Sequence, residues 1–194
     1  MSSIIAIDFG NKNCLVAAPK DGSINVLNNQ ASQRLTPSMI SFTEHRRYFG
    51  VFAQQKRMEN IRSTITQLKQ LVGLRYESNR RQKIESLELC KLVPGVTGFA
   101  FIQFDFLDKE TVFSVEQCIA FLLNGCFEIA KLNNVFSDQC VIVVPHWWSE
   151  IERRIIIDSA KVAGVKVPNL LNSTTAEAIT YLVDHQKIII ENES

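Results

Sequence analysis

The residues best suited to chemistry stand between two short apolar runs near the amino terminus. Asp8 ends an otherwise apolar segment, so its carboxylate needs a cation, a metal-bound water or several donors to replace lost hydration. Gly10 leaves room for a ligand, and the amides of Asn11 to Asn13, with Lys12 beside them, could face an anion. The pattern predicts a phosphate-holding turn with a carboxylate on the metal side. A plain polar hairpin turn with an edge acid that caps it is the alternative, and the pattern alone favours that alternative.

The flanking runs, Ile4–Ile7 and Cys14–Ala18, are the elements that would position this turn. Two β-rich runs around a short polar connection that contains glycine predict a hairpin. A turn at Asp21-Gly22 and the alternation in Ile24–Leu27 add a third strand. The chain is therefore expected to begin with an antiparallel three-stranded meander.

The next stretch is predicted to contain strands at Met39–Phe42 and Tyr48–Val51 and a short helix at Ala53–Met58. A second helix is expected from Asn60 to a stop at Gly73. Its apolar positions are Ile61, Ile65, Leu68 and Leu71–Val72.

Lys69 lies on this second helix, away from its apolar stripe. A lysine near a helix carboxyl end usually complements the helix dipole, and the pattern alone favours that role. The charged segment Arg75–Glu85 is expected to be a surface excursion. Leu87–Val93, Gly98–Phe106 and Thr111–Phe113 are then expected to form a small separate sheet.

Strands and helices alternate in the second half. Ser114–Gln117, Ser149–Glu152 and Thr174–Glu177 have the spacing of capping boxes, and each is expected to open a helix. Val141–Val144 is apolar on both faces, as in a central strand, and Val165–Leu171 is a further strand. The alternation implies a parallel component. A meander joined to such alternation is the α/β layout of an RNase-H-like or actin-like subdomain.

Composition narrows the protein class. The 194 residues are 46% hydrophobic and 21% charged, as in a globular protein with a substantial core. The net charge of +1 gives no electrostatic reason to expect nucleic acid or an anionic membrane, and no apolar run is long enough to cross a bilayer. The five cysteines form no Cys-x-x-Cys pair, which favours free thiols in a reducing, cytoplasmic compartment.

Several motifs, taken in order, resemble the heat shock protein 70 family, whose nucleotide-binding domain is an actin-like ATPase. The resemblance covers nearly the whole chain, is weakest over residues 75–109 and is greatest for the large 110-kDa-type subclass, whose members act mainly as nucleotide-exchange partners and holdases. The matching segments are Ile7–Gly10, Arg34–Ser38, Leu68–Leu74, Val141–Pro145 with Arg153, and Leu171–Ala176.

The resemblance implies roles for the nucleotide-binding segment. Asp8 matches the acid that holds water on Mg²⁺, and Gly10 to Asn13 match the loop whose amides face the β- and γ-phosphates of ATP or ADP. Asn11 and Lys12 replace the family's threonines, so hydroxyl contacts are lost.

The resemblance also implies roles for residues later in the chain. Lys69 matches the lysine that reaches the γ-phosphate and the attacking water. This match favours a role at the phosphate over the helix-dipole role. Pro145 and Arg153 match the pair that reports nucleotide state to a substrate domain. Ser173 stands where the family has a catalytic-side glutamate, so one carboxylate of the magnesium shell is missing.

The resemblance predicts a core subdomain of residues 1–36 and 114–194 and a small inserted subdomain of residues 37–113, without a second lobe or a substrate-binding domain. One hypothesis is a degenerate, non-catalytic chaperone-associated module that binds a protein partner through the face around Asp8 or the small sheet. The alternative is a lobe of an ATP-binding chaperone or cochaperone, with ATPase activity only when a second lobe completes it. A third hypothesis, an unrelated fold with chance matches, predicts that Asp8 and Ser173 lie far apart.

Other conspicuous side chains left open questions. Trp147-Trp148 could form a partner-binding patch or a wedge between layers, and neither role is favoured. His45, His146 and His185 show no metal-ligand spacing.

Overall fold

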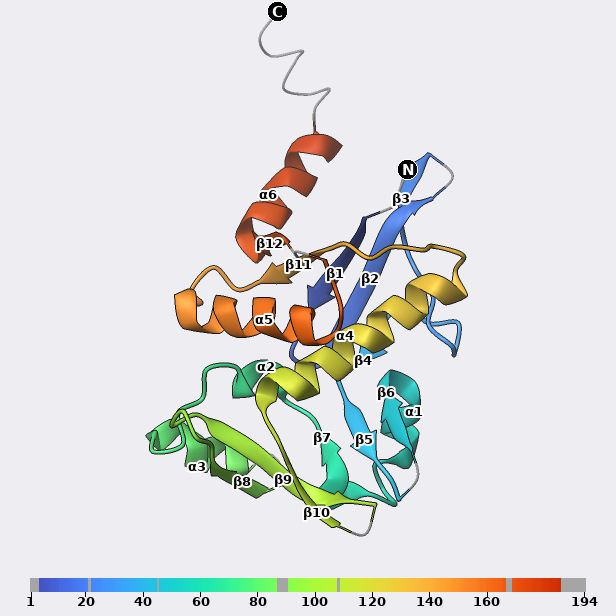
Figure 1. The fold of residues 1–194 in the computed structure, drawn as a ribbon. Coiled ribbons are helices and arrows are strands. Elements are labelled where there is room, and N and C mark those ends of the chain that lie inside the picture. Colours follow the sequence, from blue (N-terminus) through green and yellow to red (C-terminus); the bar gives the residue numbers. More distant parts are fainter. Residues whose placement is uncertain are drawn as a thin grey trace, which may run out of the picture.

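A computed structural model of the chain describes residues 4–20, 22–44, 46–86, 91–107, 109–166 and 169–185. A mixed sheet forms the upper part of the molecule (Figure 1). Its strands β1, β11 and β12 are parallel, whereas β1, β2 and β3 form the expected antiparallel meander. The order is β12 (Asn169–Asn172), β11 (Cys140–Val144), β1 (Ile5–Phe9), β2 (Asn13–Lys20) and β3 (Ser23–Val26), with β4 (Thr36–Pro37) also paired to β2.

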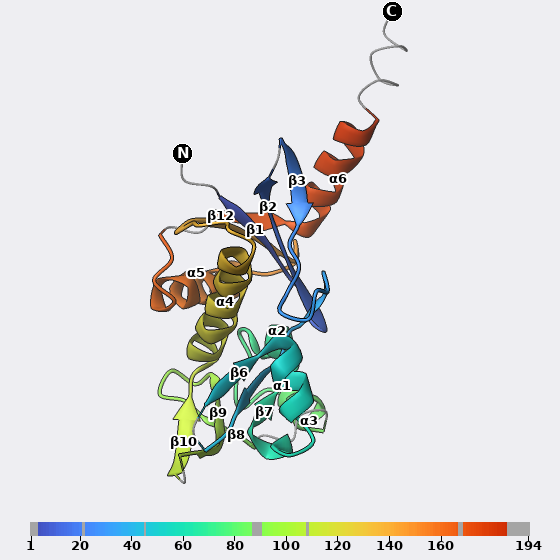
Figure 2. The ribbon, with the colours of Figure 1, turned by 90° about the vertical axis from the view of Figure 1, so that its right-hand side faces the viewer.

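Helices cover the two faces of this sheet unequally. The long helix α4 (Val115–Leu132) and α5 (Glu150–Val162) lie together on one face, and α4 contacts β2. The last helix, α6 (Ser173–Asp184), lies on the opposite side, against β11 and β12 (Figure 2). The predicted α/β architecture with a mixed, helix-flanked sheet is confirmed.

Side-chain alternation explains the two faces. In β1, Ile5, Ile7 and Phe9 are buried beneath α4 and α5, whereas the side chain of Asp8 is exposed on the other face. Successive residues of a strand point to opposite faces, so a single apolar-polar alternation places the acid outside the core.

Two of the three predicted capping boxes are confirmed. The hydroxyls of Ser114 and Ser149 accept backbone amides at the starts of α4 and α5, and Gln117 and Glu152 close each box. The third was wrong, because β12 leads directly into α6 and Asn172 occupies the N-cap without a side-chain hydrogen bond. Thr174 is therefore already inside the first turn.

The lower part of the molecule holds two three-stranded sheets (Figure 1). One consists of β6 (Arg47–Phe49), β5 (Ile40–Phe42) and β7 (Thr64–Ile65), and the other of β10 (Lys109–Phe113), β9 (Ala100–Phe106) and β8 (Lys91–Pro94). The helices here are α1 (Gly50–Lys56), the 3-10 turn η1 (Ile61–Ser63), α2 (Leu68–Leu71) and α3 (Asn79–Glu85).

The predicted helix from Asn60 to Gly73 was wrong as a single element. Ile65 pairs with Ile40 in the β5–β7 ladder, so strand pairing takes residues that the helical spacing had claimed. Only the last turn, α2, is α-helical, and Gly73 follows it with the positive φ expected of a helix stop. The charged segment 75–85 also differs from the expectation, because it contains α3 with Ile84 buried.

Aromatic side chains join the small sheets to α4. The ring of Phe42 lies 4.3 Å from that of Phe104 and 5.4 Å from that of Phe113, and Phe121 of α4 is 6.1 Å away. These contacts fix the lower part of the molecule against the end of α4.

Four of the cysteines, Cys14, Cys118, Cys126 and Cys140, are buried, reduced thiols, as expected. Among the described residues, no helix combines the length and the apolar character needed to cross a membrane. Several sequence expectations fall outside the described residues: those on Asp21, His45, residues 87–90 including Cys90, Asp108, residues 167–168 and the possible strand at 187–190.

Candidate functional site

The carboxyl ends of the parallel strands β1, β11 and β12 meet at one edge of the central sheet. Asp8 lies in register with Val143, and Val143 with Leu171. Strands are spaced by about 4.8 Å, so the backbone of Asp8 is about 10 Å from β12, and Ser173 follows that strand at the same edge. The unrelated-fold hypothesis predicted that Asp8 and Ser173 lie far apart. The strand register instead places both at the same edge of the sheet.

The turn between β1 and β2 is tightly built. A Cβ on Gly10 would lie 2.1 Å from the carbonyl oxygen of Asn13, so only glycine fits. Ser38 holds the turn from outside: its hydroxyl donates to the Gly10 carbonyl at 2.8 Å and its amide to the Lys12 carbonyl at 3.0 Å. The turn is thereby fixed while the Lys12 side chain remains exposed.

Lys69 reaches this edge from α2, which both views place just beyond the end of β1 (Figures 1 and 2). Its ammonium nitrogen is 5.9 Å from the centre of the Phe9 ring and 6.0 Å from that of Trp148. Burial lowers the pKa of Lys69, and the carboxylate of Asp8 partly opposes this. Asp8 and Lys69, which belong to two separate motifs of the resemblance, thus interact electrostatically.

Gln67 was not anticipated from the sequence. Its side-chain oxygen accepts hydrogen bonds from the amide of Asn11, at 2.7 Å, and from that of Gln70, at 2.9 Å. Its φ of 35° is unusual for a residue with a side chain. No sequence signal could have found it, since glutamine is not a residue that marks left-handed backbone.

Arg153 joins three segments that lie apart in the chain. Its guanidinium donates to the carbonyls of Trp148 and Pro145, at 3.1 and 3.4 Å, and to the side-chain oxygen of Asn172, at 2.6 Å. Pro145 and Arg153 are therefore in direct contact, and Asn172 extends their connection to the end of β12.

The two tryptophans have different environments, one suited to a wedge between layers and the other to a partner-binding patch. Trp148 packs against the core, with its ring 6.5 Å from that of Phe9, so it acts as a wedge. Trp147 is 71% exposed and can meet a ligand or partner.

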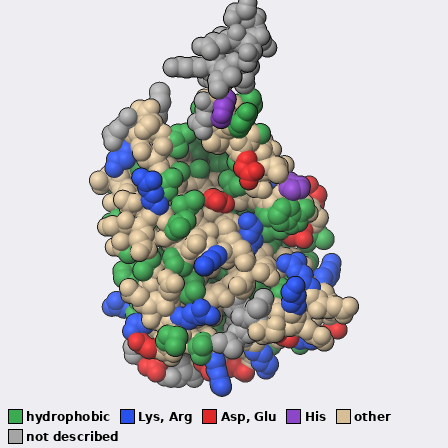
Figure 3. Space-filling model, turned by 180° about the vertical axis from the view of Figure 1, so that it is seen from behind, with side chains coloured by type: hydrophobic (Ala, Val, Ile, Leu, Met, Phe, Trp, Pro, Cys, Tyr) green, Lys and Arg blue, Asp and Glu red, His purple; other side chains and the backbone are tan. Residues whose placement is uncertain are grey.

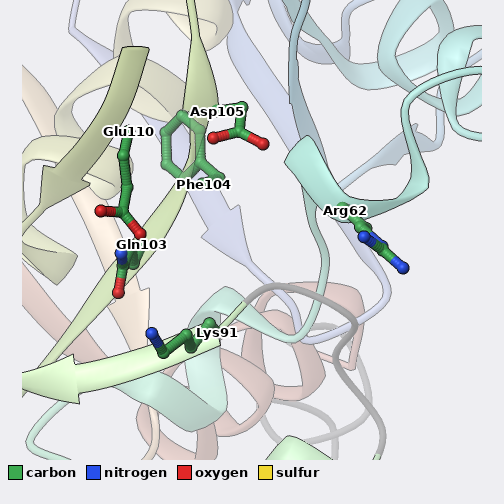
Figure 4. Close-up of a pocket in the computed structure, with 6 residues that line it drawn as sticks. All are labelled: Arg62, Lys91, Gln103, Phe104, Asp105 and Glu110. Carbon is green, nitrogen blue, oxygen red and sulfur yellow. The ribbon is translucent and has the colours of Figure 1, made fainter.

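A cavity of about 380 Å³ adjoins the β1–β2 turn. Its described lining includes Lys12 and Arg57 with no acidic residue, and also Asn11, Ser38 and Gln67. A smaller cavity of about 150 Å³ on the small sheet (Figure 4) is lined by Arg62, Lys91, Gln103, Phe104, Asp105 and Glu110. In Figure 4 the Arg62 side chain is directed away from the others, and none of the sequence-predicted site residues lies there.

The face of the sheet that exposes Asp8, opposite α4 and α5, is called the open face and lies on the side of the molecule shown in Figure 3. Acidic and basic side chains occur together there below a group of hydrophobic ones (Figure 3).

Within the described part of the chain, no group of three His, Cys, Asp or Glu side chains is placed to hold a metal ion by itself.

Comparison with known proteins shows the family of the chain. The family model described as Hsp70 protein matches residues 4–193. Heat shock protein 88 of Dictyostelium discoideum is 34% identical over 93% of the chain and 24% of its own length. Heat shock 70 kDa protein 14 of Arabidopsis thaliana and a heat shock protein homolog of Candida glabrata are each 32% identical, over 92% and 93% of the chain and 22% and 26% of their own lengths. The chain thus spans about a quarter of these relatives.

Proposed function

Because the chain belongs to the Hsp70 protein family and is homologous to the nucleotide-binding domain of that family, we propose that it forms one wall of a site for the phosphates of a magnesium-bound adenine nucleotide. The wall is the edge formed by Asp8, the turn from Gly10 to Asn13, and Lys69. On its own this wall binds and does not hydrolyse.

The observation that carries the proposal is the meeting of Lys69 with the end of β1. Sixty residues separate Asp8 from Lys69 in the chain, yet Lys69 lies beside Phe9, and the charge of Asp8 raises the pKa of Lys69 against the effect of burial. Partial burial removes some of the hydration of the ammonium group, and the two rings, 5.9 and 6.0 Å away, replace only part of it. The arrangement is better explained by an anion that compensates for the burial when it binds.

The residues present fit a phosphate group and its cation. Gly10 admits a backbone turn that no other residue would allow, Lys12 of that turn is exposed, and Lys69 lies beside Phe9 at the end of β1, so both can supply positive charge. The exposed carboxylate of Asp8 suits a water bound to Mg²⁺. When bound, the cation would neutralise phosphate charge; Asp8 would orient its water, and Lys69 would face the terminal phosphate.

Ser173 supports the restriction to binding. A serine hydroxyl at the end of β12 cannot supply the negative charge of a carboxylate, so the acidic complement of the edge is Asp8 alone among the predicted site residues. Phosphoryl transfer depends on charge stabilisation and positioning around the whole phosphate group. Hydrolysis would therefore require groups contributed by another lobe.

The proposal extends to protein partners and to the compartment. The relatives are heat shock proteins, and Trp147 and apolar side chains of α6 are exposed. We infer a chaperone or cochaperone role in the cytoplasm, in which the Pro145–Arg153–Asn172 contacts transmit the state of the edge to the partner.

Isothermal titration of the chain with Mg-ATP and Mg-ADP tests the proposal. We expect binding that Asp8→Asn and Lys69→Met each weaken by about 10- to 100-fold, the equivalent of one lost charge-assisted contact. Lys91→Met, which removes a lysine from the small-sheet cavity, is the matched control and should bind as the parent chain does.

Two outcomes would contradict the proposal. One is the absence of binding at millimolar nucleotide, which would favour the degenerate module that binds only a protein partner. The other is binding that falls as much in Lys91→Met as in Lys69→Met, which would place the nucleotide elsewhere.

A further inference from the structure

Gln67 stands in an unfavourable backbone conformation between two functional segments. It precedes α2 with φ 35° and ψ 24°, in the left-handed region that residues with a side chain rarely adopt. Such strain persists only where surrounding contacts hold the residue in place, and it often occurs at functional sites. The contacts that hold Gln67 are hydrogen bonds of its own side chain and backbone.

One oxygen atom of Gln67 joins the β1–β2 turn to α2. It accepts from the side-chain amide of Asn11, 56 residues away in the chain, at 2.7 Å, and from that of Gln70 at 2.9 Å. The backbone carbonyl of Gln67 also accepts the amide of Gln70, at 2.8 Å. Lys69 lies between Gln67 and Gln70, two residues that are hydrogen-bonded to each other twice.

This clasp, formed by Asn11, Gln67 and Gln70, also fixes the side chain of Asn11. Its amide nitrogen donates to Gln67, and its oxygen is buried without a hydrogen-bond partner among the described residues. Asn11 is therefore held by the clasp, and Asn11, Gln67 and Lys12 all line the adjoining cavity. An unpaired buried oxygen is costly, and the clasp must compensate for it.

We propose that Gln67 is a positioning residue: its side-chain oxygen ties Asn11 of the turn to Gln70 of α2 and so holds Lys69 at the carboxyl end of β1. The placement of Lys69 is a property of the free chain. Its consequence for nucleotide affinity rests on the proposed function above.

The placement can be measured by nuclear magnetic resonance of the free chain carrying lysine labelled with ¹³C at the ε carbon. Lys69→Arg identifies the Lys69 signal by its loss. In the parent chain we expect a signal that is displaced by the rings of Phe9 and Trp148 and that titrates below the usual lysine pKa of 10.5. Gln67→Met keeps the side-chain length and removes the acceptor, so the signal should move to the position and titration of exposed lysines.

Two further variants separate positioning from general stability. Gln67→Gly removes the acceptor and also relieves the backbone strain, so it should remain folded and still release Lys69. Asn11→Ala cuts the clasp from the other side and should have the same effect. Gln55→Met, on the exposed surface of α1, should leave the Lys69 signal unchanged. An unchanged signal in folded Gln67→Met, Gln67→Gly and Asn11→Ala would overturn the inference.

Titration with Mg-ADP distinguishes this inference from the proposed function. We expect Gln67→Met and Gln67→Gly to bind several-fold more weakly than the parent chain. A parent chain that does not bind contradicts the proposed function, while the Lys69 signal still decides the positioning role. A parent chain that binds, with affinity unchanged in variants that release Lys69, would overturn the functional part of the inference alone.

Discussion

The two faces of the central sheet are built for different purposes. Beneath α4 and α5 the alternate side chains of β1, β2 and β11 are almost completely buried: Ile5, Ile7, Phe9, Cys14, Val16, Ala18, Cys140, Ile142 and Val144. On the other face, Asp8 is exposed and Val141 and Val143 are only partly covered, and α6 packs against the β11 and β12 side of the sheet. The closed face provides cohesion, and the open face carries the exposed acid.

The difference shows why a carboxylate can end an apolar strand without disturbing it. Asp8 belongs to the open face, so its charge keeps water and needs no buried partner. Lys69 meets the same edge from the side of Phe9 and Trp148, where it is partly buried. The candidate site lies where the two faces end, with one charge hydrated and the other partly desolvated.

Truncation of neighbouring residues on β11 should separate the two faces most strongly. Ile142, which is fully buried, should lose about 2–5 kcal/mol of unfolding free energy on substitution by alanine, through lost burial and a cavity. Val143→Ala, one residue away on the open face, should lose about 1 kcal/mol or less. Urea denaturation measures both, and equal losses would contradict the division into a closed and an open face.

Helix caps offer a smaller contrast between the layers. Ser149→Ala removes the cap of α5 on the closed face and should cost about 1 kcal/mol of unfolding free energy. Thr174→Ala on α6 should change little, since Thr174 is not the N-cap. Thermal unfolding of the two variants provides the measurement, and a larger loss in Thr174→Ala would restore the capping box that the structure rejects.

The smallest expected effect is the pH dependence contributed by Lys69. Burial lowers its pKa from the usual 10.5, so between the lowered value and 10.5 the folded chain binds fewer protons than the unfolded chain. Its contribution to the unfolding free energy should therefore rise as pH increases through that range. Denaturant unfolding of the parent chain and of Lys69→Met at several alkaline pH values measures this contribution. The unfolding free energy of the parent chain minus that of the variant should increase with pH. A decrease with pH would contradict the partial burial of Lys69.

Local pattern determined much of the fold. The hairpin around Gly10, the meander, the central strand at Val141–Val144 and the capping boxes at Ser114 and Ser149 all depend on neighbours within a few residues, and they formed as predicted. The expected helix through Ile65 failed because Ile40, distant in the chain, offered a strand to pair with. Helical spacing over a short β-branched segment cannot reveal such a partner.

The sequence by itself determined which residues could carry charge or accept a tight turn, because Asp8, Gly10 and Lys69 owe those abilities to their own side chains or the lack of one. Tertiary structure alone decided how they are held: which face exposes Asp8, which rings flank Lys69, and that Gln67 fastens the turn to α2. Hydrogen bonds between residues 56 positions apart and the register of parallel strands depend on the packing of the whole chain. No local pattern records them.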